Sequence, residues 1–256
     1  MSEMPSSGRP VGFAHRGARL DEPENTMPAF RRALEAGVDG IETDCWLSAD
    51  GEVVCAHDAT VPDSAGRSLR GRRKLSVRDS PASELAASGV PRLAEVLAGL
   101  RPEFGAFAIS IDAKHDEVIE PLLEVCAAAD ALDDLWLCHP DHAVLAGHRS
   151  ATTAHLVHSR LRGTISTPIE RHAHDLARLG IEAMNFHHSE WSGGLVSLFH
   201  RFGVRAFAWD VQEERHLQAM LAIGIDALYC DRPERLTATL GARRDAPTGE
   251  DRATGT

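Results

Sequence analysis

Two carboxylates, Glu42 and Asp44, lie two residues apart in a segment that reads as a strand, Gly40–Leu47. Residues i and i+2 of a strand point to the same face. Two ionised carboxylates held together repel each other unless one is protonated or a cation lies between them. Because an unpaired acidic pair that faces a core is costly, the pair predicts a metal site. The alternative interpretation is an exposed strand edge.

The residues after this strand indicate a hairpin that brings a histidine to the acidic pair. Residues 50–51, Asp-Gly, are typical of a two-residue turn, which would place Ala49 opposite Glu52. The same register places Asp44 opposite His57, with Cβ atoms about 4.5–5.5 Å apart. The hairpin therefore predicts a histidine beside the carboxylates.

A second histidine follows the first expected strand, Val11–Ala14, as His15, with Arg16 next to it. In a sequentially wound parallel barrel this strand neighbours Gly40–Leu47, and the carboxyl ends of both strands open on one face. His15 and His57 could then act as general base and general acid at a phosphoester, because the pKa of imidazole lies near neutral pH. The guanidinium of Arg16 offers a fork of donors for phosphate oxygens.

A third carboxylate, Asp112, and a cation, Lys114, follow the expected strand Phe107–Ile111. With Glu42 and Asp44, Asp112 completes a set of oxygen ligands, which favours Mg²⁺ or Ca²⁺ over Zn²⁺. Such an ion would polarise the phosphoryl group and a nucleophilic hydroxyl or water. An alternative for Lys114 is an ion pair in solvent.

These residues need a scaffold that gathers strand ends in one place. Short apolar or β-branched runs alternate with longer amphipathic stretches, which is typical of parallel β/α architecture. Eight candidate strands occur, the number that a closed parallel barrel needs. The sequence therefore predicts an α/β fold, a (β/α)₈ TIM-type barrel. The candidate strands are Val11–Ala14, Gly40–Leu47, Phe107–Ile111, Leu135–His139, Ala154–His158, Ala183–Phe186, Val204–Trp209 and Ile225–Tyr229.

The length of 256 residues suits one barrel domain, which we expect over residues 10–240. Residues 58–106 are longer than an ordinary βα loop and predict a small insertion after the hairpin of the second strand. The polar ends, 1–9 and 241–256, predict flexible tails. Helices are predicted at 25–37, 91–97 and 212–222.

The composition argues against several classes of partner. The chain carries 27 Lys and Arg against 38 Asp and Glu, a formal net charge of -11, which disfavours binding to nucleic acid or anionic membranes. No stretch is typical of a signal peptide or a membrane anchor. The five cysteines form no CxxC pair, which favours reduced thiols and a cytoplasmic location. The sequence does not indicate an oligomeric state.

Motifs along the chain resemble the signature of the glycerophosphodiester phosphodiesterase family in both order and spacing. The resemblance extends from Val11 to about Leu240. The motifs are His15-Arg16-Gly17, Pro23-Glu24-Asn25-Thr26, Gly40-Ile41-Glu42-x-Asp44, Val53-Val54-x-x-His57-Asp58, Ile111-Asp112-Ala113-Lys114, Ala208-Trp209-Asp210-Val211 and Asp231-Arg232-Pro233.

The resemblance implies hydrolysis of a small-molecule glycerophosphodiester to glycerol 3-phosphate and an alcohol, with one Mg²⁺ or Ca²⁺ ion, in lipid and glycerol metabolism. It implies that His15 and His57 are the catalytic acid–base pair. Three positions depart from the family pattern: Asp112 stands where Glu is more usual, and Asp210 and Cys230 stand where Thr is usual. The implied metal ligands are Glu42, Asp44 and Asp112, and the implied substrate contacts are Arg16, Glu24, Lys114 and Trp209.

Other candidate residues have competing interpretations. Asn185 and His139, at the ends of their strands, are predicted substrate contacts if the barrel forms. Trp209 could serve only barrel packing, and Glu24 could serve only as a helix-start carboxylate. Four further histidines could form a second metal site. No suitably spaced carboxylate accompanies them, so we interpret them as loop or helix-face residues. These histidines are His172, His174, His187 and His188.

Two other functions are compatible with the same residues. One is a lysophospholipase D-like or other phospholipid phosphodiesterase activity, because one barrel can serve different substrates. The other is a non-catalytic barrel that binds phosphate esters. The complete set of histidines and carboxylates favours catalysis, and the lack of an apolar anchor disfavours a lipid substrate.

Overall fold

The structure is a computed structural model that describes residues 9–63 and 74–241. Eight parallel strands pair around a closed ring, which β1 completes by pairing with both β11 and β2. The predicted (β/α)₈ barrel is therefore confirmed. The strands of the ring are β1 (Val11–Ala14), β2 (Gly40–Leu47), β6 (Ala108–Ala113), β7 (Leu135–His139), β8 (His155–Ser159), β9 (Ala183–His187), β10 (Arg205–Trp209) and β11 (Ala227–Cys230).

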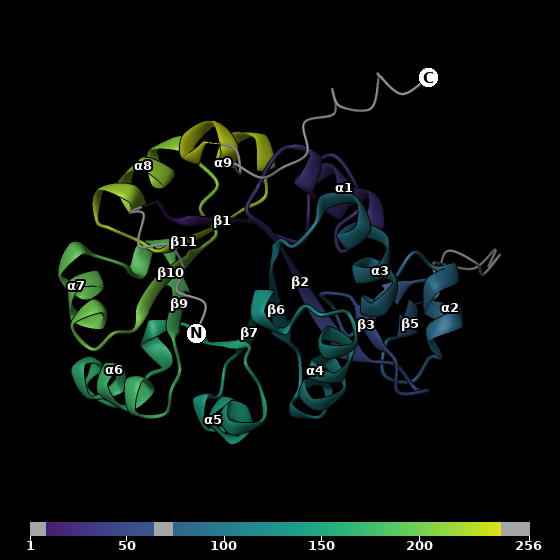
Figure 1. The fold of residues 1–256 in the computed structure, drawn as a ribbon, viewed down its shortest axis with the longest axis horizontal. Coiled ribbons are helices and arrows are strands. Elements are labelled where there is room, and N and C mark those ends of the chain that lie inside the picture. Colours follow the sequence, from purple (N-terminus) through teal and green to yellow (C-terminus); the bar gives the residue numbers. More distant parts are fainter. Residues whose placement is uncertain (1–8, 64–73, 242–256) are drawn as a thin grey trace.

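Helices surround the ring of strands, as Figure 1 shows. The first helix illustrates how the sequence sets their ends. The hydroxyl of Thr26 accepts a hydrogen bond from the backbone N–H of Ala29, and the chain leaves the helix through Gly37, whose φ is 81°. The helices are α1 (Met27–Glu35), α3 (Leu93–Phe104), α4 (Ile119–Ala128), α5 (His142–His148), α6 (Ile169–Arg178), α7 (Gly193–Arg201), α8 (Glu214–Ala222) and α9 (Pro233–Leu240).

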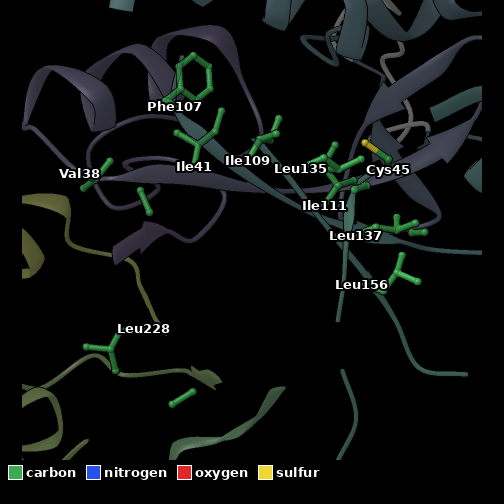
Figure 2. Packing of buried hydrophobic residues seen from close by; sticks show 14 of the residues in the cluster. Val38, Ile41, Cys45, Phe107, Ile109, Ile111, Leu135, Leu137, Leu156 and Leu228 are labelled. Atoms are coloured by element: carbon green, nitrogen blue, oxygen red, sulfur yellow. The ribbon is translucent and has the colours of Figure 1, made fainter. Parts of the chain in front are cut away.

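An apolar layer lies between the strands and the helices. Figure 2 shows part of it, including Ile41 from β2, Ile109 from β6 and Leu137 from β7. These three side chains are fully buried. Burial of one such side chain contributes roughly 1.5–3 kcal/mol. This layer fixes the helices against the barrel and so holds the strand ends in place.

A second, smaller apolar cluster fills the interior of the barrel. The rings of Phe13 and Tyr229 stack with their centroids 5.0 Å apart, and the hydroxyls of Tyr229 and Ser110 form a hydrogen bond of 2.9 Å. Strand residues alternate between the two faces, so Glu42 and Asp44 on β2 face this same interior. The barrel therefore has an apolar floor and polar side chains toward the carboxyl ends of its strands.

The segment between β2 and β6 contains additional elements. They are β3 (Val53–Cys55), which runs antiparallel to β2, the paired strands β4 (Thr60–Pro62) and β5 (Lys74–Ser76), and helix α2 (Ala82–Ala87) before α3. Val54, Leu75 and Leu85 form a separate small apolar cluster that packs these elements together. Residues 64–73 of the predicted insertion lie outside the described ranges, and so do residues 1–8 and 242–256 of the predicted tails.

The predicted register of the hairpin is wrong by one residue. Cys45 faces Cys55, so Asp44 lies level with Ala56 and not with His57. The reason is a three-residue turn over 49–51 in place of the predicted two-residue turn: the N–H of Ser48 donates to the carbonyl of Glu52 at 2.9 Å. Gly51 takes a left-handed backbone, φ 81°, which is typical of three-residue hairpin loops.

Two further differences concern element bounds. Strand β6 extends to Ala113, so Asp112 lies within the strand, where it pairs with Asp44, and does not follow it. Helix α3 extends well beyond the predicted residues 91–97. Across the described residues, no helix has the length and apolar character needed to cross a membrane.

Candidate active site

A pocket of about 320 Å³ opens among the carboxyl ends of the strands. It brings together every predicted site residue except Glu24 and His139, although those residues come from segments spread over the whole barrel. Polar groups dominate the wall on the side of β1, β2 and β6. The predicted site residues that line the pocket are His15, Arg16, Glu42, Asp44, His57, Asp112, Lys114, Asn185 and Trp209.

His15 follows β1 and is held between two carboxylates. Its Nδ1 lies 2.6 Å from Oδ1 of Asp231, and its Nε2 lies 3.9 Å from Oε2 of Glu42. A carboxylate only accepts hydrogen bonds when ionised, so Nδ1 carries the proton and Nε2 faces the pocket. Burial lowers the pKa of His15, but Glu42 and the hydrogen bond to Asp231 outweigh it and raise the pKa above its ordinary value.

Asp231 follows β11, the strand that pairs with β1, and was not among the predicted site residues. Burial alone would raise its pKa, but His15 holds that pKa below the ordinary value. The N–H of Asp231 donates to Oε1 of Gln212 at 2.9 Å, which fixes the backbone on which the carboxylate stands. The motif Asp231-Arg232-Pro233 marked this position in the sequence, but no spacing rule connects it to His15.

Glu42 and Asp44 are almost completely buried, with 6% and 2% of their surfaces exposed. Burial, followed by repulsion from Asp44, raises the pKa of Glu42 to about 7. The backbone N–H of Arg16 donates to Oε2 of Glu42 at 2.9 Å, and Arg16 adopts a left-handed φ of 56°. The exposed-edge alternative for this acidic pair is therefore wrong.

Lys114 lies between two carboxylates of the pocket. Its Nζ is 2.6 Å from Oδ1 of Asp44 and donates to Oδ2 of Asp112 at 2.8 Å. Burial opposes ionisation of both acids, but Lys114 overcomes it for Asp44, whose pKa is lowered. The pKa of Asp112 is raised, chiefly by burial. The lysine thus pairs inside the pocket and not in open solvent.

The loop after β1 supports the site from the side of Arg16. The guanidinium of Arg16 donates to Oε1 of Glu24 at 3.0 Å, and Arg19 lies 2.9 Å from Oε2 of the same carboxylate. Asn25, a buried residue without a predicted role, donates to Oδ2 of Asp44 at 3.1 Å. Glu24 therefore lies at the rim as a partner of Arg16, and Asn25 positions a carboxylate.

The remaining predicted residues differ in their environments. His57 lines the pocket in spite of the shifted register, and its Nδ1 lies 2.8 Å from Oδ1 of Asp58. Asn185 donates to the hydroxyl of Ser159 at 3.1 Å, while its Oδ1 is buried without a partner. His139 does not line the pocket, and the prediction that it faces the mouth is wrong, because the inward positions of β7 are residues 136 and 138.

Comparison with known proteins identifies the family. The model of the glycerophosphoryl diester phosphodiesterase family matches residues 15–235. The chain belongs to this family. A glycerophosphodiester phosphodiesterase from Bacillus altitudinis is 29% identical to it over 240 residues, which cover 87% of this chain and 95% of the relative.

Solved structures share the fold of this chain. The glycerophosphodiester phosphodiesterase of Thermotoga maritima has a TM-score of 0.74 at 23% identity, over 90% of this chain and 97% of its own. An Oleispira antarctica phosphodiesterase in complex with the product sn-glycerol-3-phosphate has a TM-score of 0.75 at 20% identity, over 91% and 98%. As a member of the family, the protein is a phosphoric diester hydrolase.

A further cluster adjoins the pocket at the ends of β9 and β10. One potential ligand atom from each of His187, His188 and Asp210 lies within 4.8 Å of the others, and this is the one such group of three or more His, Cys, Asp or Glu residues in the described ranges. The prediction that no carboxylate accompanies these histidines is wrong, because Asp210, which directly follows the neighbouring strand β10, lies beside His187. His174 is exposed on α6, as predicted, but His172 on the same helix is buried.

Proposed function

We propose that this protein hydrolyses glycerophosphodiesters to sn-glycerol 3-phosphate and an alcohol by acid–base catalysis with His15 and His57. The observation that carries the proposal is the pocket in which both imidazoles meet Arg16 and Lys114. Two imidazoles can accept the proton of a nucleophile and return one to a leaving alkoxide. Family membership and the product-bound phosphodiesterase of Oleispira antarctica support this substrate class.

The role of His15 follows from its contacts. Because Asp231 holds Nδ1, Nε2 is the nitrogen that can exchange a proton with the substrate. Arg16 and Lys114 supply positive charge to the phosphoryl oxygens, on which negative charge grows during the reaction. His57 contributes the second imidazole from the segment after β3, so catalysis depends on the hairpin as well as on the barrel.

The carboxylates fit a divalent cation of the Mg²⁺ or Ca²⁺ type. Glu42 and Asp44 are buried side by side, and the pKa of Glu42 rises to about 7, first because of burial and then because of Asp44. A cation between them would remove this repulsion. Glu42, Asp44 and Asp112 would hold it through oxygen atoms, which such ions prefer. When bound, the cation would neutralise charge on the phosphoryl group.

The test is release of glycerol 3-phosphate from glycerophosphocholine and glycerophosphoethanolamine after treatment with EDTA and addition of Mg²⁺ or Ca²⁺. We expect release only with metal, and a loss of roughly 10²–10³-fold in Glu42→Gln, the scale of removing one electrostatic contact to the transition state. Glu124→Gln, an exposed position on α4, is the matched control. Equal rates with EDTA and with metal would contradict the metal requirement.

Failure to release glycerol 3-phosphate from either substrate would contradict the proposed substrate class. Activity on lysophospholipids would then support the phospholipid alternative, and binding of phosphate esters without turnover would support the non-catalytic barrel.

We also propose a cytoplasmic location, which the cysteines support: Cys45, Cys55, Cys126, Cys138 and Cys230 are all free and buried.

A further inference from the structure

Three metal-binding groups meet where β9 and β10 end side by side. His187 is the last residue of β9 and pairs with Trp209, the last residue of β10. Asp210 and His188 follow directly in the sequence, so the two strand ends supply all three groups. Trp209 and Asp210 also line the catalytic pocket. The cluster therefore adjoins that pocket through Asp210, at the ends of strands that do not carry Glu42 or Asp44.

The spacing within the cluster suits one small cation. Nε2 of His187 and Oδ2 of Asp210 are 3.1 Å apart. Two ligands about 2.0–2.1 Å from a tetrahedral ion lie about 3.3 Å from each other, so this pair needs little movement. The ring centroids of His187 and His188 are 4.4 Å apart, and all three ligand atoms lie within 4.8 Å of one another.

Neighbouring side chains orient two of the groups. Nδ1 of His187 lies 2.7 Å from the hydroxyl of Ser189 and accepts from the backbone N–H of Ser189 at 3.3 Å, while Nε2 faces Oδ2 of Asp210. A cation at Nε2 would displace the proton that this nitrogen shares with Asp210, and a proton on Nδ1 would then donate to the hydroxyl of Ser189. Metal-bound histidines commonly make such a hydrogen bond through their second nitrogen. Gln212 donates to Oδ1 of Asp210 at 3.3 Å, which leaves Oδ2 for a cation.

The backbone at Asp210 is unusual for a residue with a side chain. Its φ is 60°, in the left-handed region that few non-glycine residues adopt, although Asp and Asn tolerate it best. Such conformations gather at functional sites. Arg16 and Asn25, which donate hydrogen bonds to Glu42 and Asp44, share this backbone with φ values of 56° each. Asp210 thus shares a backbone feature with these two residues, and Asp130, which does not line the pocket, has it too.

We propose that His187, His188 and Asp210 form a second divalent-metal site that binds an ion of the Zn²⁺ class. Imidazole nitrogens suit Zn²⁺, whereas Mg²⁺ and Ca²⁺ prefer oxygen ligands. Three protein ligands would leave one coordination position of a tetrahedral ion open. The site does not depend on the proposed reaction, because its ligands are separate from Glu42, Asp44 and Asp112.

The test is Zn²⁺ binding to the chelator-treated protein in the presence of excess Mg²⁺, which occupies oxygen sites. We expect the wild type to bind one equivalent of Zn²⁺. Zn²⁺ affinity should be at least about tenfold weaker in His188→Ala and in Asp210→Asn, and about 10–100-fold weaker in Ser189→Ala. Asn keeps the left-handed backbone at residue 210, so that variant retains the fold. Co²⁺ in place of Zn²⁺ gives a second readout, a visible spectrum that His188→Ala would change.

Two variants separate this proposal from the proposed function. Glu42→Gln disables the carboxylate set and leaves Zn²⁺ affinity unchanged. His174→Ala removes an exposed histidine that also has an acidic neighbour, Asp175, and it too leaves Zn²⁺ affinity unchanged. The proposal is overturned if no equivalent of Zn²⁺ binds, if His188→Ala and Asp210→Asn bind it as the wild type does, or if Glu42→Gln abolishes binding.

Discussion

The imidazole of His15 is fixed by Asp231 through Nδ1 and faces Glu42 through Nε2. Two carboxylates thus determine its tautomer and raise its pKa, against the effect of burial. Asp231 acts through His15 and is a positioning residue. Its own backbone is tied to Gln212, so the orientation of His15 depends on two neighbouring strands at once.

Asp231→Asn is expected to lower kcat/KM by roughly 10²–10⁴-fold, the usual contribution of a positioned acid or base, with little change in KM. The substitution removes the negative charge that raises the pKa of His15. The limb of the pH–rate profile that reports His15 should therefore move to lower pH. Asp133→Asn, at an exposed position, is the control. Wild-type activity with an unmoved pH profile would contradict this role.

At the residue scale, most of the site could be predicted because its residues lie within or directly after the barrel strands, where side-chain alternation decides direction. The prediction for His139 is wrong because of the same alternation: residues 136 and 138 occupy the inward positions of β7, so residue 139 points away from the interior. Asp231 and Asn25 could not be assigned from spacing. Each acts through a partner distant in the sequence, His15 for Asp231 and Asp44 for Asn25.

One additional residue in the turn between β2 and β3 shifts the register of this hairpin by one position. The two-residue turn was a reasonable expectation for Asp-Gly, but Ser48 and Glu52 close a three-residue turn over residues 49–51. The hydroxyl of Ser48 accepts from the N–H of Glu52 at 3.0 Å and donates to Asp50 at 2.6 Å, which stabilises the longer turn. Such side-chain hydrogen bonds cannot be read from the alternation of apolar residues.

Substitution of two glycines by alanine should have opposite effects on the free energy of unfolding. Gly51 has a φ of 81°, so Gly51→Ala is expected to destabilise the fold by about 1–2 kcal/mol although the space is open. Gly147 lies within α5 and also has open space around it, so Gly147→Ala is expected to stabilise by about 0.5–1 kcal/mol. Urea unfolding measures both, and the same sign for both would contradict this account.

Three histidines pack where β8 meets α5 and α6. Nδ1 of His158 lies 3.1 Å from Nε2 of His172, and Nε2 of His158 lies 3.0 Å from the carbonyl of Pro140. The ring of His142 lies 5.1 Å from that of His158 and 5.3 Å from that of His172. Because the carbonyl can only accept, His158 carries its proton on Nε2 and accepts from His172, so both rings are neutral.

The contribution of His158 and His172 to the free energy of unfolding should fall between pH 7 and pH 5. Burial first, and then neighbouring charges, lower the pKa of His158 to about 3 and that of His172 to about 4. The unfolded chain binds protons below a pKa of about 6.5, whereas the folded chain does not until these lower values. The stability is therefore present above about pH 6.5 and lost on acidification, by on the order of 2 kcal/mol for each histidine at pH 5.

His172→Gln keeps an N–H donor for His158 and removes one of the two titrating groups, so its stability should fall less steeply with acidification. His174→Gln is the matched control on the same helix, and it should retain the wild-type slope. Urea unfolding at pH 7, 6 and 5 measures these slopes. Identical slopes for the wild type and His172→Gln would show that the buried pair does not carry the pH dependence.

Closure of the barrel unites residues that lie far apart in the sequence. Because β1 pairs with both β2 and β11, His15 lies between Glu42 on one side and Asp231 on the other. Eight apolar runs that alternate with amphipathic stretches were enough to predict this architecture. The cluster of His187, His188 and Asp210 was not predictable, because it depends on the pairing of β9 with β10 and on the backbone of Asp210.

The most direct test of the whole account is release of glycerol 3-phosphate from glycerophosphocholine by the wild type, His15→Ala, His57→Ala and the control His148→Ala, a position at the end of α5. We predict metal-dependent release by the wild type and by His148→Ala, and a loss of roughly 10²-fold or more in each of the other two variants. Wild-type rates in either His15→Ala or His57→Ala would contradict the assignment of this pocket as the catalytic site.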